Sequence, residues 1–240
     1  TAPISWGICE VPGWGVQLPV ERVLAEMVEL GFPATELGSD GYLPTDPAEL
    51  RSLLGSYNLT LLAGFVPVVI HDPDQADETL RRAEATAALL AASGARYFNS
   101  APVTSWDWED RTELSPKQWD HAMAMFDRLE KVTEAHGLTQ VLHTHVGTIV
   151  ETKEEVARVL DGCDVSFVLD TAHLAVGGYD PVDFVNVAAD RVGRAVRDPS
   201  SSGARRRSPR GCSGRPLHRR CGTAESCLQG CARASAADRP

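Results

Sequence analysis

Two short apolar runs in this chain end in residues that can bind a metal ion. Residues 141–145 close on His143 and His145, and residues 165–173 close on Asp170 and His173. Imidazole and carboxylate together suit a divalent transition metal. In (β/α)8 barrels the chemistry collects at the carboxyl ends of successive strands. The two runs therefore predict a metal site at the mouth of such a barrel.

Each pair also has a plainer interpretation. His143 and His145 stand two apart on a predicted strand, so their side chains leave on one face, but they could simply be half-buried histidines bonded to backbone. Asp170 follows an apolar strand, where a carboxylate is costly unless it is paired or binds a cation. It could instead cap the loop that follows. Two pairs on consecutive strands favour the metal site.

Further residues stand where a substrate would be bound or turned over. Glu36 ends a predicted strand and could bond a substrate hydroxyl, although a solvated glutamate fits nearly as well. His71 follows the next strand and could line the same mouth. Four tryptophans lie at strand ends or in loops, where aromatic rings suit a sugar or polyol, although core packing explains Trp6 equally; they are Trp6, Trp14, Trp106 and Trp108. Glu151 begins the helix after the histidine strand, where the helix dipole alone would favour an acid.

The elements that must position these residues alternate regularly. Strands are predicted over residues 4–9, 34–37, 59–69, 96–101, 139–145 and 165–169, with an irregular end to the third. Helices are predicted over 19–30, 46–57, 74–92, 115–136, 153–160 and 180–189. Such β-then-α units predict a parallel sheet, either a barrel or a doubly wound sheet. The glycine-rich nucleotide motifs are missing, which disfavours the doubly wound alternative. A seventh strand would begin near residue 191.

The composition narrows the classes of function. The 240 residues are 43% hydrophobic and carry a net charge of −10, which supports a sizeable core and disfavours nucleic acid as a partner. No apolar run reaches the ~18–20 residues of a membrane helix and no signal peptide opens the sequence, so no membrane partner is expected. Only two of the six cysteines lie in the first 200 residues, which disfavours a disulfide scaffold and fits a cytoplasmic protein.

The composition changes abruptly near residue 194. Residues 194–240 hold eleven arginines, three acidic residues and no aromatic residue, a net charge of +8, so the remainder carries −18. A segment this poor in apolar side chains cannot bury enough surface to offset its ordering entropy. We therefore expect a barrel-type domain over 1–193 and a tail over 194–240 outside the native fold.

At these residues the sequence resembles the xylose-isomerase-like barrel superfamily of sugar isomerases and epimerases, and within it the inosose dehydratases. The resemblance spans about residues 3–193. The pattern His-x-His-x-Gly-Thr at 143–148 is typical of the inosose branch, whereas Asp-Thr-x-His at 170–173 is shared more widely. Other resembling segments are residues 4–8, 31–38, 136–138 and 180–181.

The resemblance implies an α/β fold, a (β/α)8 TIM barrel truncated here after about six βα units. It implies a metal-dependent lyase or isomerase of a keto-polyol or sugar, a small-molecule partner, and one divalent metal from the set Mn, Co, Mg and Zn. The metal would polarise a carbonyl while a nearby base moves the adjacent proton. A sugar isomerase or epimerase and an inactive product are the alternatives, and a homo-oligomer is compatible with the sequence.

The resemblance also assigns roles by position. His143 and Asp170 correspond to metal ligands, His145 faces the substrate, and His173 contacts substrate or metal. The candidate catalytic residues are thus His145, His173 and Glu151, and the candidate substrate-binding residues are Glu36, Trp6 and His71.

The sequence departs from the family after residue 192. The family continues with a seventh strand of the form His-Val-His-Leu-Lys-Asp and an eighth that ends in Glu, whereas residues 193–198 here read Gly-Arg-Ala-Val-Arg-Asp. Our hypothesis is a shifted reading frame in a GC-rich gene, and the alternative is a natural basic tail. With two of four expected ligands missing, we expect weak metal binding and impaired turnover.

Overall fold

The described part of the structure extends to the end of the sixth strand. A computed structural model describes residues 1–9, 15–109 and 111–195. The chain divides into two units, Thr1–Arg197 and Asp198–Pro240, and the second lies outside the described residues. The predicted tail, with its proposed frameshift, therefore lies outside them too, apart from the backbone of residues 194 and 195.

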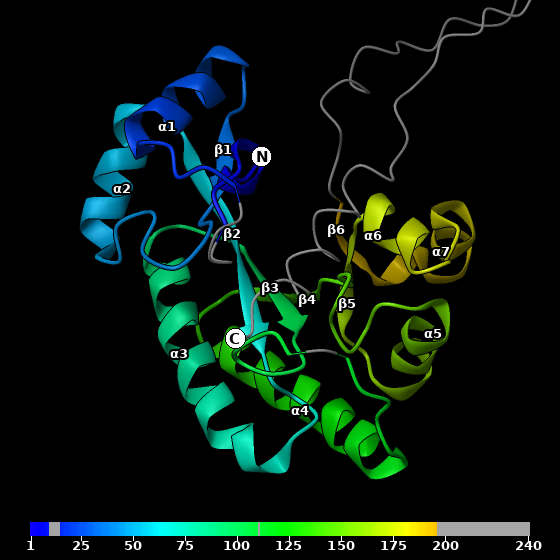
Figure 1. The fold of residues 1–240 in the computed structure, drawn as a ribbon. Helices are drawn as coiled ribbons and strands as arrows, with labels where there is room; N and C mark the ends of the chain where they lie inside the picture. The colour runs from blue at the N-terminus through cyan, green and yellow to red at the C-terminus, as the bar shows by residue number, and fades with distance from the viewer. Residues whose placement is uncertain (10–14, 110, 196–240) are drawn as a thin grey trace, which may run out of the picture. The chain divides into compact units, whose positions relative to one another are not determined.

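Six parallel strands form one open, curled sheet (Figure 1). They are β1 (Ala34–Glu36), β2 (Thr60–Val68), β3 (Tyr97–Pro102), β4 (Thr139–Leu142), β5 (Ser166–Leu169) and β6 (Val192–Ala195). Each strand pairs with the next in chain order, and every pair is parallel. The carboxyl ends of all six strands therefore lie at one edge, as the predicted incomplete barrel requires.

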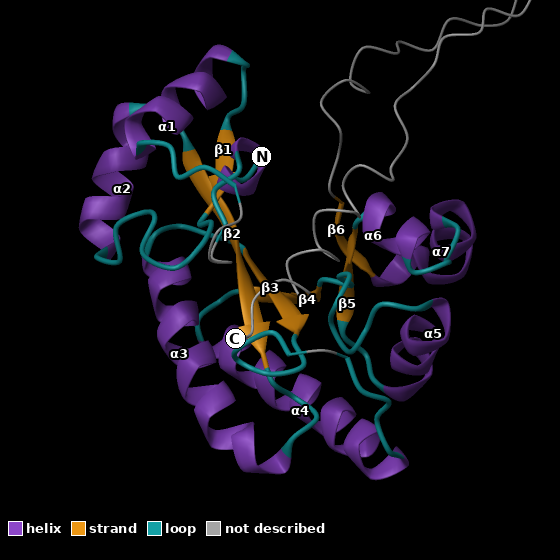
Figure 2. Ribbon diagram, in the orientation of Figure 1, coloured by secondary structure: helices purple, strands orange, loops and turns teal. Residues whose placement is uncertain are grey.

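Helices lie on the outer side of this sheet (Figure 2). They are α1 (Val20–Glu29), α2 (Pro47–Ser56), α3 (Ala76–Ala92), α4 (Pro116–Ala135), α5 (Lys153–Gly162), α6 (Thr171–Val176) and α7 (Pro181–Ala188). Short 3-10 helices cover Pro3–Trp6, Pro73–Gln75 and Ala189–Arg191. None of the described helices is both long and apolar enough to span a membrane.

Local signals placed several helix starts correctly. Asp46 accepts the backbone N–H groups of Ala48 and Glu49, with Pro47 in the first turn, as predicted. Proline suits this position because its fixed φ is helical and its missing N–H would have no partner there. Ser115 and Thr152 each close a capping box, the first with Gln118 and the second with Glu155, which satisfies otherwise unpaired donors.

The predicted first strand, residues 4–9, is wrong. Residues Pro3–Trp6 form a 3-10 helix instead. Pro3 supplies a helical φ at its start, and Gly7 ends it with a φ of 81°, donating its N–H to Ile4. Glycine adopts this left-handed conformation without a steric cost. The strand count is still six because the seventh predicted strand is present as β6.

Two strand ends also differ from prediction. The strand predicted over 139–145 stops at Leu142, so both following histidines belong to a loop. The irregular end predicted for β2 is absent, because its pairing with β3 runs in register from Ala63 to Val68. β1 pairs with β2 only as far as Ala63. Beyond that point β2 has a free edge on one side among the described strands, and an edge accommodates Pro67.

The core fills the space between the sheet and its helices. Its largest fully buried side chains include Phe98 and Phe167 on strands and Phe126 and Leu129 on α4. Burying each of these contributes about 1.5–3 kcal/mol. Strands β3, β4 and β5 contribute to this core, and they carry the loops of the candidate site.

Candidate metal and substrate site

Two neighbouring strand ends present the four residues that the sequence singled out. His143 and His145 lie in the loop after β4, Asp170 directly follows β5, and His173 is the third residue of α6. β4 and β5 pair directly, with Val141 opposite Ser166. The two histidines were predicted on the strand itself, whereas they lie in the loop that follows it. The predicted location of the site, at the carboxyl end of this strand, is unchanged.

Asp170 combines the two roles that the sequence left open. Its Oδ1 caps α6 by accepting the backbone N–H groups of Ala172 at 2.9 Å and His173 at 3.0 Å. Its Oδ2 lies 3.5 Å from Nε2 of His143, an ion-pair distance that is too long for a good hydrogen bond. The cap thus fixes the carboxylate so that its second oxygen faces the histidines.

The donor atoms of His143, Asp170 and His173 form a candidate metal-binding triad. One ligand atom from each residue lies within 4.8 Å of the others. Both ring nitrogens of the half-buried His143 are inaccessible to solvent, and neither has a hydrogen-bond partner among the described residues. A buried polar nitrogen without a partner is costly, and two imidazoles with one carboxylate are a donor set that zinc and similar ions accept. The residues therefore fit a divalent metal.

Burial keeps this site low in positive charge. Burial, with His173 and His143 nearby, lowers the pKa of His145 to about 3. Burial also lowers the pKa of His173. Burial opposes the ionised form of Asp170, but His143 and the backbone N–H of His173 outweigh it and hold that carboxyl pKa below its ordinary value. Neutral imidazoles beside a carboxylate attract a cation.

His145 lies beside the triad and is held in one tautomer. Its Nδ1 is 2.7 Å from the carbonyl oxygen of Val146. Because a carbonyl only accepts, Nδ1 carries the proton and Nε2 keeps its lone pair. The ring centroid of His145 is 4.0 Å from that of His173, and the backbone N–H of Val146 is 3.4 Å from His173 Nδ1. His145 is therefore placed to accept a proton next to the triad.

Two aromatic rings flank the histidines. The Phe65 ring on β2 lies 5.5 Å from both His143 and His145, centroid to centroid. Trp108 stacks on Phe65 at 6.2 Å and meets His145 at 6.1 Å. Trp108 has a φ of 56°, unusual for a bulky residue. Phe65 was not predicted, although its place two residues after Ala63, on the same face of β2, is a signal that period-2 alternation carries.

Glu36 lies on the same face of the sheet as Phe65, beside a residue of β2 that comes two positions before Phe65. It pairs with Ala63 in the sheet, and Phe65 pairs with Asn99. The Asn99 side-chain amide donates to Glu36 Oε2 at 3.2 Å, while its Oδ1 has no hydrogen-bond partner among the described residues. Sequence reasoning missed Asn99, because nothing local marks an asparagine on a strand as facing inward.

Trp6 and His71 lie apart from the histidines. The Trp6 indole donates to Glu26 on α1 at 2.7 Å. His71 lines a separate pocket of about 350 Å³ together with Gln75 and Trp106. Burial lowers the pKa of His71. Within the described residues, neither makes a hydrogen bond or ring contact with the triad, so their substrate roles stay predictions.

Glu151 does not occupy the first turn of α5, as the dipole interpretation required. It precedes the N-cap Thr152. Its Oε2 accepts the backbone N–H of Gly147 at 2.7 Å and lies 3.3 Å from the Arg111 guanidinium. The carboxylate thus ties down the loop that carries His145.

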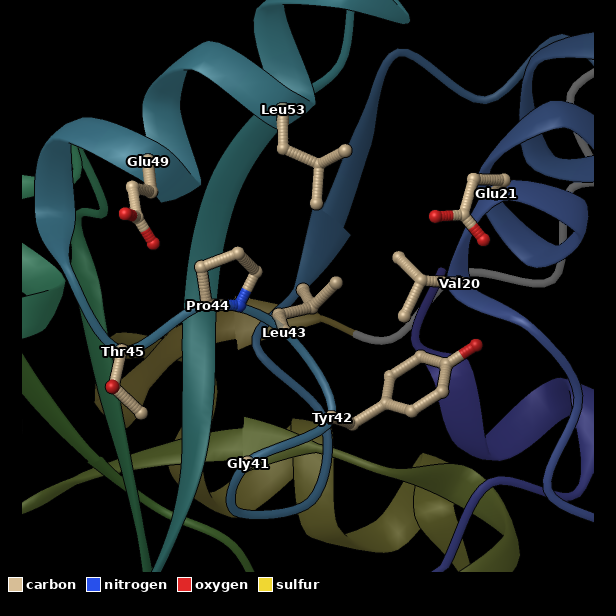
Figure 3. A pocket seen from close by; sticks show the side chains of 9 residues that line it. All are labelled: Val20, Glu21, Gly41, Tyr42, Leu43, Pro44, Thr45, Glu49 and Leu53. Carbon is tan, nitrogen blue, oxygen red and sulfur yellow. The ribbon is translucent and has the colours of Figure 1, made fainter.

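A further hollow, of about 430 Å³, opens between α1 and α2 (Figure 3). Figure 3 shows Glu21 of α1 and Glu49 of α2 on opposite sides, with Leu43 and Leu53 between them. None of the predicted site residues lines it. The hollow is therefore distinct from the triad.

Comparison with known proteins identifies a matching family and several similar sequences. A family model described as xylose isomerase-like TIM barrel matches residues 24–198. The inosose dehydratase of Geobacillus kaustophilus is 33% identical over 203 residues, which are 80% of this chain and 65% of that protein. The rhizopine catabolism protein MocC of Rhizobium meliloti is 34% identical over 191 residues, which are 75% and 57% of the two chains. This chain thus spans less than two thirds of the length of either relative.

Solved structures agree on the fold. An L-ribulose 3-epimerase superposes with a TM-score of 0.63 at 20% identity, over 81% of this chain and 67% of that one. A structure described as the IOLI protein with a binding zinc atom superposes with a TM-score of 0.60 at 15% identity, over 73% of this chain and 66% of that one. Identities this low support the architecture alone.

Proposed function

Because this chain belongs to the xylose isomerase-like TIM barrel family, we propose that its site is that of a metal-dependent lyase which dehydrates a keto-polyol of the inosose type. The observation that carries the proposal is the triad of His143, Asp170 and His173 within 4.8 Å, with His145 beside it. The similarity to inosose dehydratases supports the substrate class.

The triad residues would hold one divalent cation from the set Mn, Co, Mg and Zn. Such a cation supplies Lewis-acid polarisation of the substrate carbonyl. His145, unprotonated at Nε2 and held by Val146 through Nδ1, takes the proton on the carbon next to that carbonyl. The hydroxyl on the following carbon then leaves as water after it is protonated. The donor is His145, which returns the proton that it took, while His173, 4.0 Å from it between ring centroids, would help to hold the cation.

The remaining inner-face residues suit a polyol. The Phe65 and Trp108 rings offer an apolar face, on which the C–H face of a sugar or polyol ring packs well. Glu36 and Asn99 add a carboxylate and an amide for hydroxyl groups. Trp6 and His71 are proposed only as peripheral substrate contacts. Glu151 stays a predicted catalytic residue whose observed contacts are those to Gly147 and Arg111.

We further infer that metal binding and turnover are weak in this chain. The strand β6 lies where the family resemblance places a histidine-bearing strand, but its residues read Val-Gly-Arg-Ala and offer no ligand. The family match ends at residue 198, close to the change of composition at 194. The resemblance implies four ligands, and the expected histidine of the seventh strand and glutamate of the eighth have no counterpart in this sequence.

The experiment compares substrates on the purified full chain. We expect slow, chelator-sensitive dehydration of 2-keto-inositol that Mn²⁺ or Co²⁺ restores, and no dehydration by His143→Ala. Ketohexoses and hydroxypyruvate test the isomerase alternative. Faster conversion of a ketohexose than of 2-keto-inositol would overturn the lyase proposal. Stoichiometric metal binding without turnover of any of these substrates would favour the alternative that this chain is a catalytically inactive product. Tight metal binding with full activity would refute the impairment.

A further inference from the structure

We propose that Arg111, in the loop after β3, is a positioning residue that sets the placement of His145 and His173 relative to each other. The inference rests on the proposed function only in supposing that these histidines serve a metal site. Arg111 is half-buried and touches neither histidine directly. Its influence passes through the loop after β4 and the residues that end α6.

One guanidinium binds three points of the segment 148–155. The Nε of Arg111 donates to the Thr148 carbonyl at 2.6 Å, one terminal nitrogen bonds Glu155, and the other lies 3.3 Å from Glu151. All three side chains are at most 30% exposed. Charge-assisted bonds from a planar guanidinium are strong and geometrically specific at such sites. Arg111 therefore fixes this segment as a unit.

Glu151 and Glu155, which bond Arg111, also bind backbone N–H groups in or next to this segment. Glu155 Oε2 accepts the backbone N–H groups of Glu151 at 2.9 Å and Thr152 at 2.8 Å. Glu151 in turn accepts the N–H of Gly147, which has a φ of 81°. The turn from Gly147 to Thr152 thus has each of these donors tied to a carboxylate that Arg111 holds.

From this turn the contacts reach His145. The buried Thr148 hydroxyl donates to the His145 carbonyl at 2.7 Å, and the Thr148 backbone N–H also bonds that carbonyl. Next to it, Val146 accepts from His145 Nδ1 and directs its own N–H to His173 Nδ1. Thr148 therefore links Arg111 to the His145 backbone, because it bonds both of them.

The same turn also abuts the end of α6, the helix that carries His173. Lys153 donates its backbone N–H to the Gly177 carbonyl at 3.0 Å. A side chain at Gly177 would lie 2.0 Å from the Glu151 carbonyl oxygen, a distance that no real contact shows. Because every other residue carries a Cβ, only glycine at position 177 allows the end of α6 to lie this close to the Glu151 carbonyl. A shift of Glu151 would be transmitted to α6 and to His173.

Removing the guanidinium would also leave two carboxylates facing each other without a cation. Glu151 and Glu155 both bond Arg111, and without its charge the two carboxylates repel each other, with only their backbone N–H partners left. The turn would open to separate them. Its connections to Val146 and to Gly177 would then move His145 and His173 apart.

The test compares Arg111→Met and Arg111→Lys with Arg81→Met, a control that removes an exposed ion pair with Glu78. Cobalt binding is followed by visible absorption, and the histidine ring signals of the metal-free protein by NMR. Loss of a partner that contacts a metal ligand directly costs ~10–100-fold in metal affinity, and loss of Arg111, which contacts no ligand, should cost about tenfold, the lower end of that range. We expect a loss of this size for Arg111→Met, little rescue by lysine, shifted His145 and His173 signals, and no change for Arg81→Met.

A second variant keeps the inference testable if Arg111→Met fails to fold. Thr148→Val leaves the guanidinium in place and removes the hydroxyl bond to the His145 carbonyl, so it should shift the His145 signal more than the His173 signal. Cobalt affinity within twofold of wild type for both Arg111 variants, with unchanged histidine signals, would overturn the inference. If the wild type binds no cobalt, the proposed function fails, while the metal-free histidine signals still decide the role of Arg111.

Discussion

The two oxygens of Asp170 face different partners: Oδ1 caps α6 through the N–H groups of Ala172 and His173, and Oδ2 lies 3.5 Å from His143 Nε2. One carboxylate thereby orients the helix that carries His173 and completes the triad. Because the cap is a local contact and the ion pair is not, the two roles can be separated by substitution.

Asp170→Asn is expected to separate the cap from the metal site. Asparagine caps a helix about as well as aspartate, whereas alanine loses about 1 kcal/mol. The free energy of unfolding should therefore fall more for Asp170→Ala than for Asp170→Asn, while both variants lose cobalt binding. Urea denaturation and a cobalt titration of the same samples measure the two effects. Wild-type cobalt affinity in Asp170→Asn would remove the carboxylate from the ligand set.

Stability of the metal-free protein is expected to fall as the pH drops below about 6.5. The folded-state pKa values of His145 and His173 are lowered by burial, so below the unfolded value the unfolded chain binds more protons and is favoured. For His145, with a folded pKa of about 3, the loss reaches about 2 kcal/mol at pH 5.

His145→Gln isolates this contribution. Glutamine does not titrate, so the variant should lose less stability than the wild type between pH 7 and pH 5. Denaturation at several pH values, with a chelator present, gives the two slopes. Equal slopes would show that His145 titrates in the folded state as it does in water.

Trp108 is expected to contribute to substrate binding at a cost in backbone energy. Removing its ring should raise KM about three- to tenfold, the energy of one aromatic contact, with cobalt affinity unchanged. Its φ of 56° also predicts a difference between variants, because a left-handed residue other than glycine costs about 1–2 kcal/mol.

Two replacements of Trp108 separate the ring from the backbone. Trp108→Gly should unfold at higher denaturant than Trp108→Ala, since only glycine is at ease at this φ, while both raise KM equally. An alanine variant as stable as the glycine variant would mean that the loop relaxes out of the left-handed conformation.

The hypothesis of a shifted reading frame after about codon 193 predicts what another frame of the gene encodes. That frame should read as a strand with two histidines followed by further barrel segments, in place of the eleven arginines and four cysteines of residues 194–240. Resequencing the gene from independent isolates tests it. An unbroken frame in every isolate would establish a natural tail.

The sequence by itself determined the features that depend on near neighbours along the chain. Helix starts at Asp46 and Ser115 follow from short-range bonds between a side chain and the next few N–H groups. At Asp170 the sequence offered a cap of the following loop as one of two alternatives, and the helix α6 that this residue caps was not predicted. Alternation of strands and helices indicated a parallel sheet, because such connections require a crossover. That placed the histidines and Asp170 at one edge.

Only the tertiary structure decided which residues complete the site. Phe65 meets the histidines, Asn99 bonds Glu36, and Arg111 bonds the turn after the histidine loop. These contacts between distant segments depend on sheet register and curvature, which no local pattern encodes. The end of β4 at Leu142 was likewise visible only in the structure. The short-range energies that favour a strand or a turn are small, and packing with distant segments outweighs them.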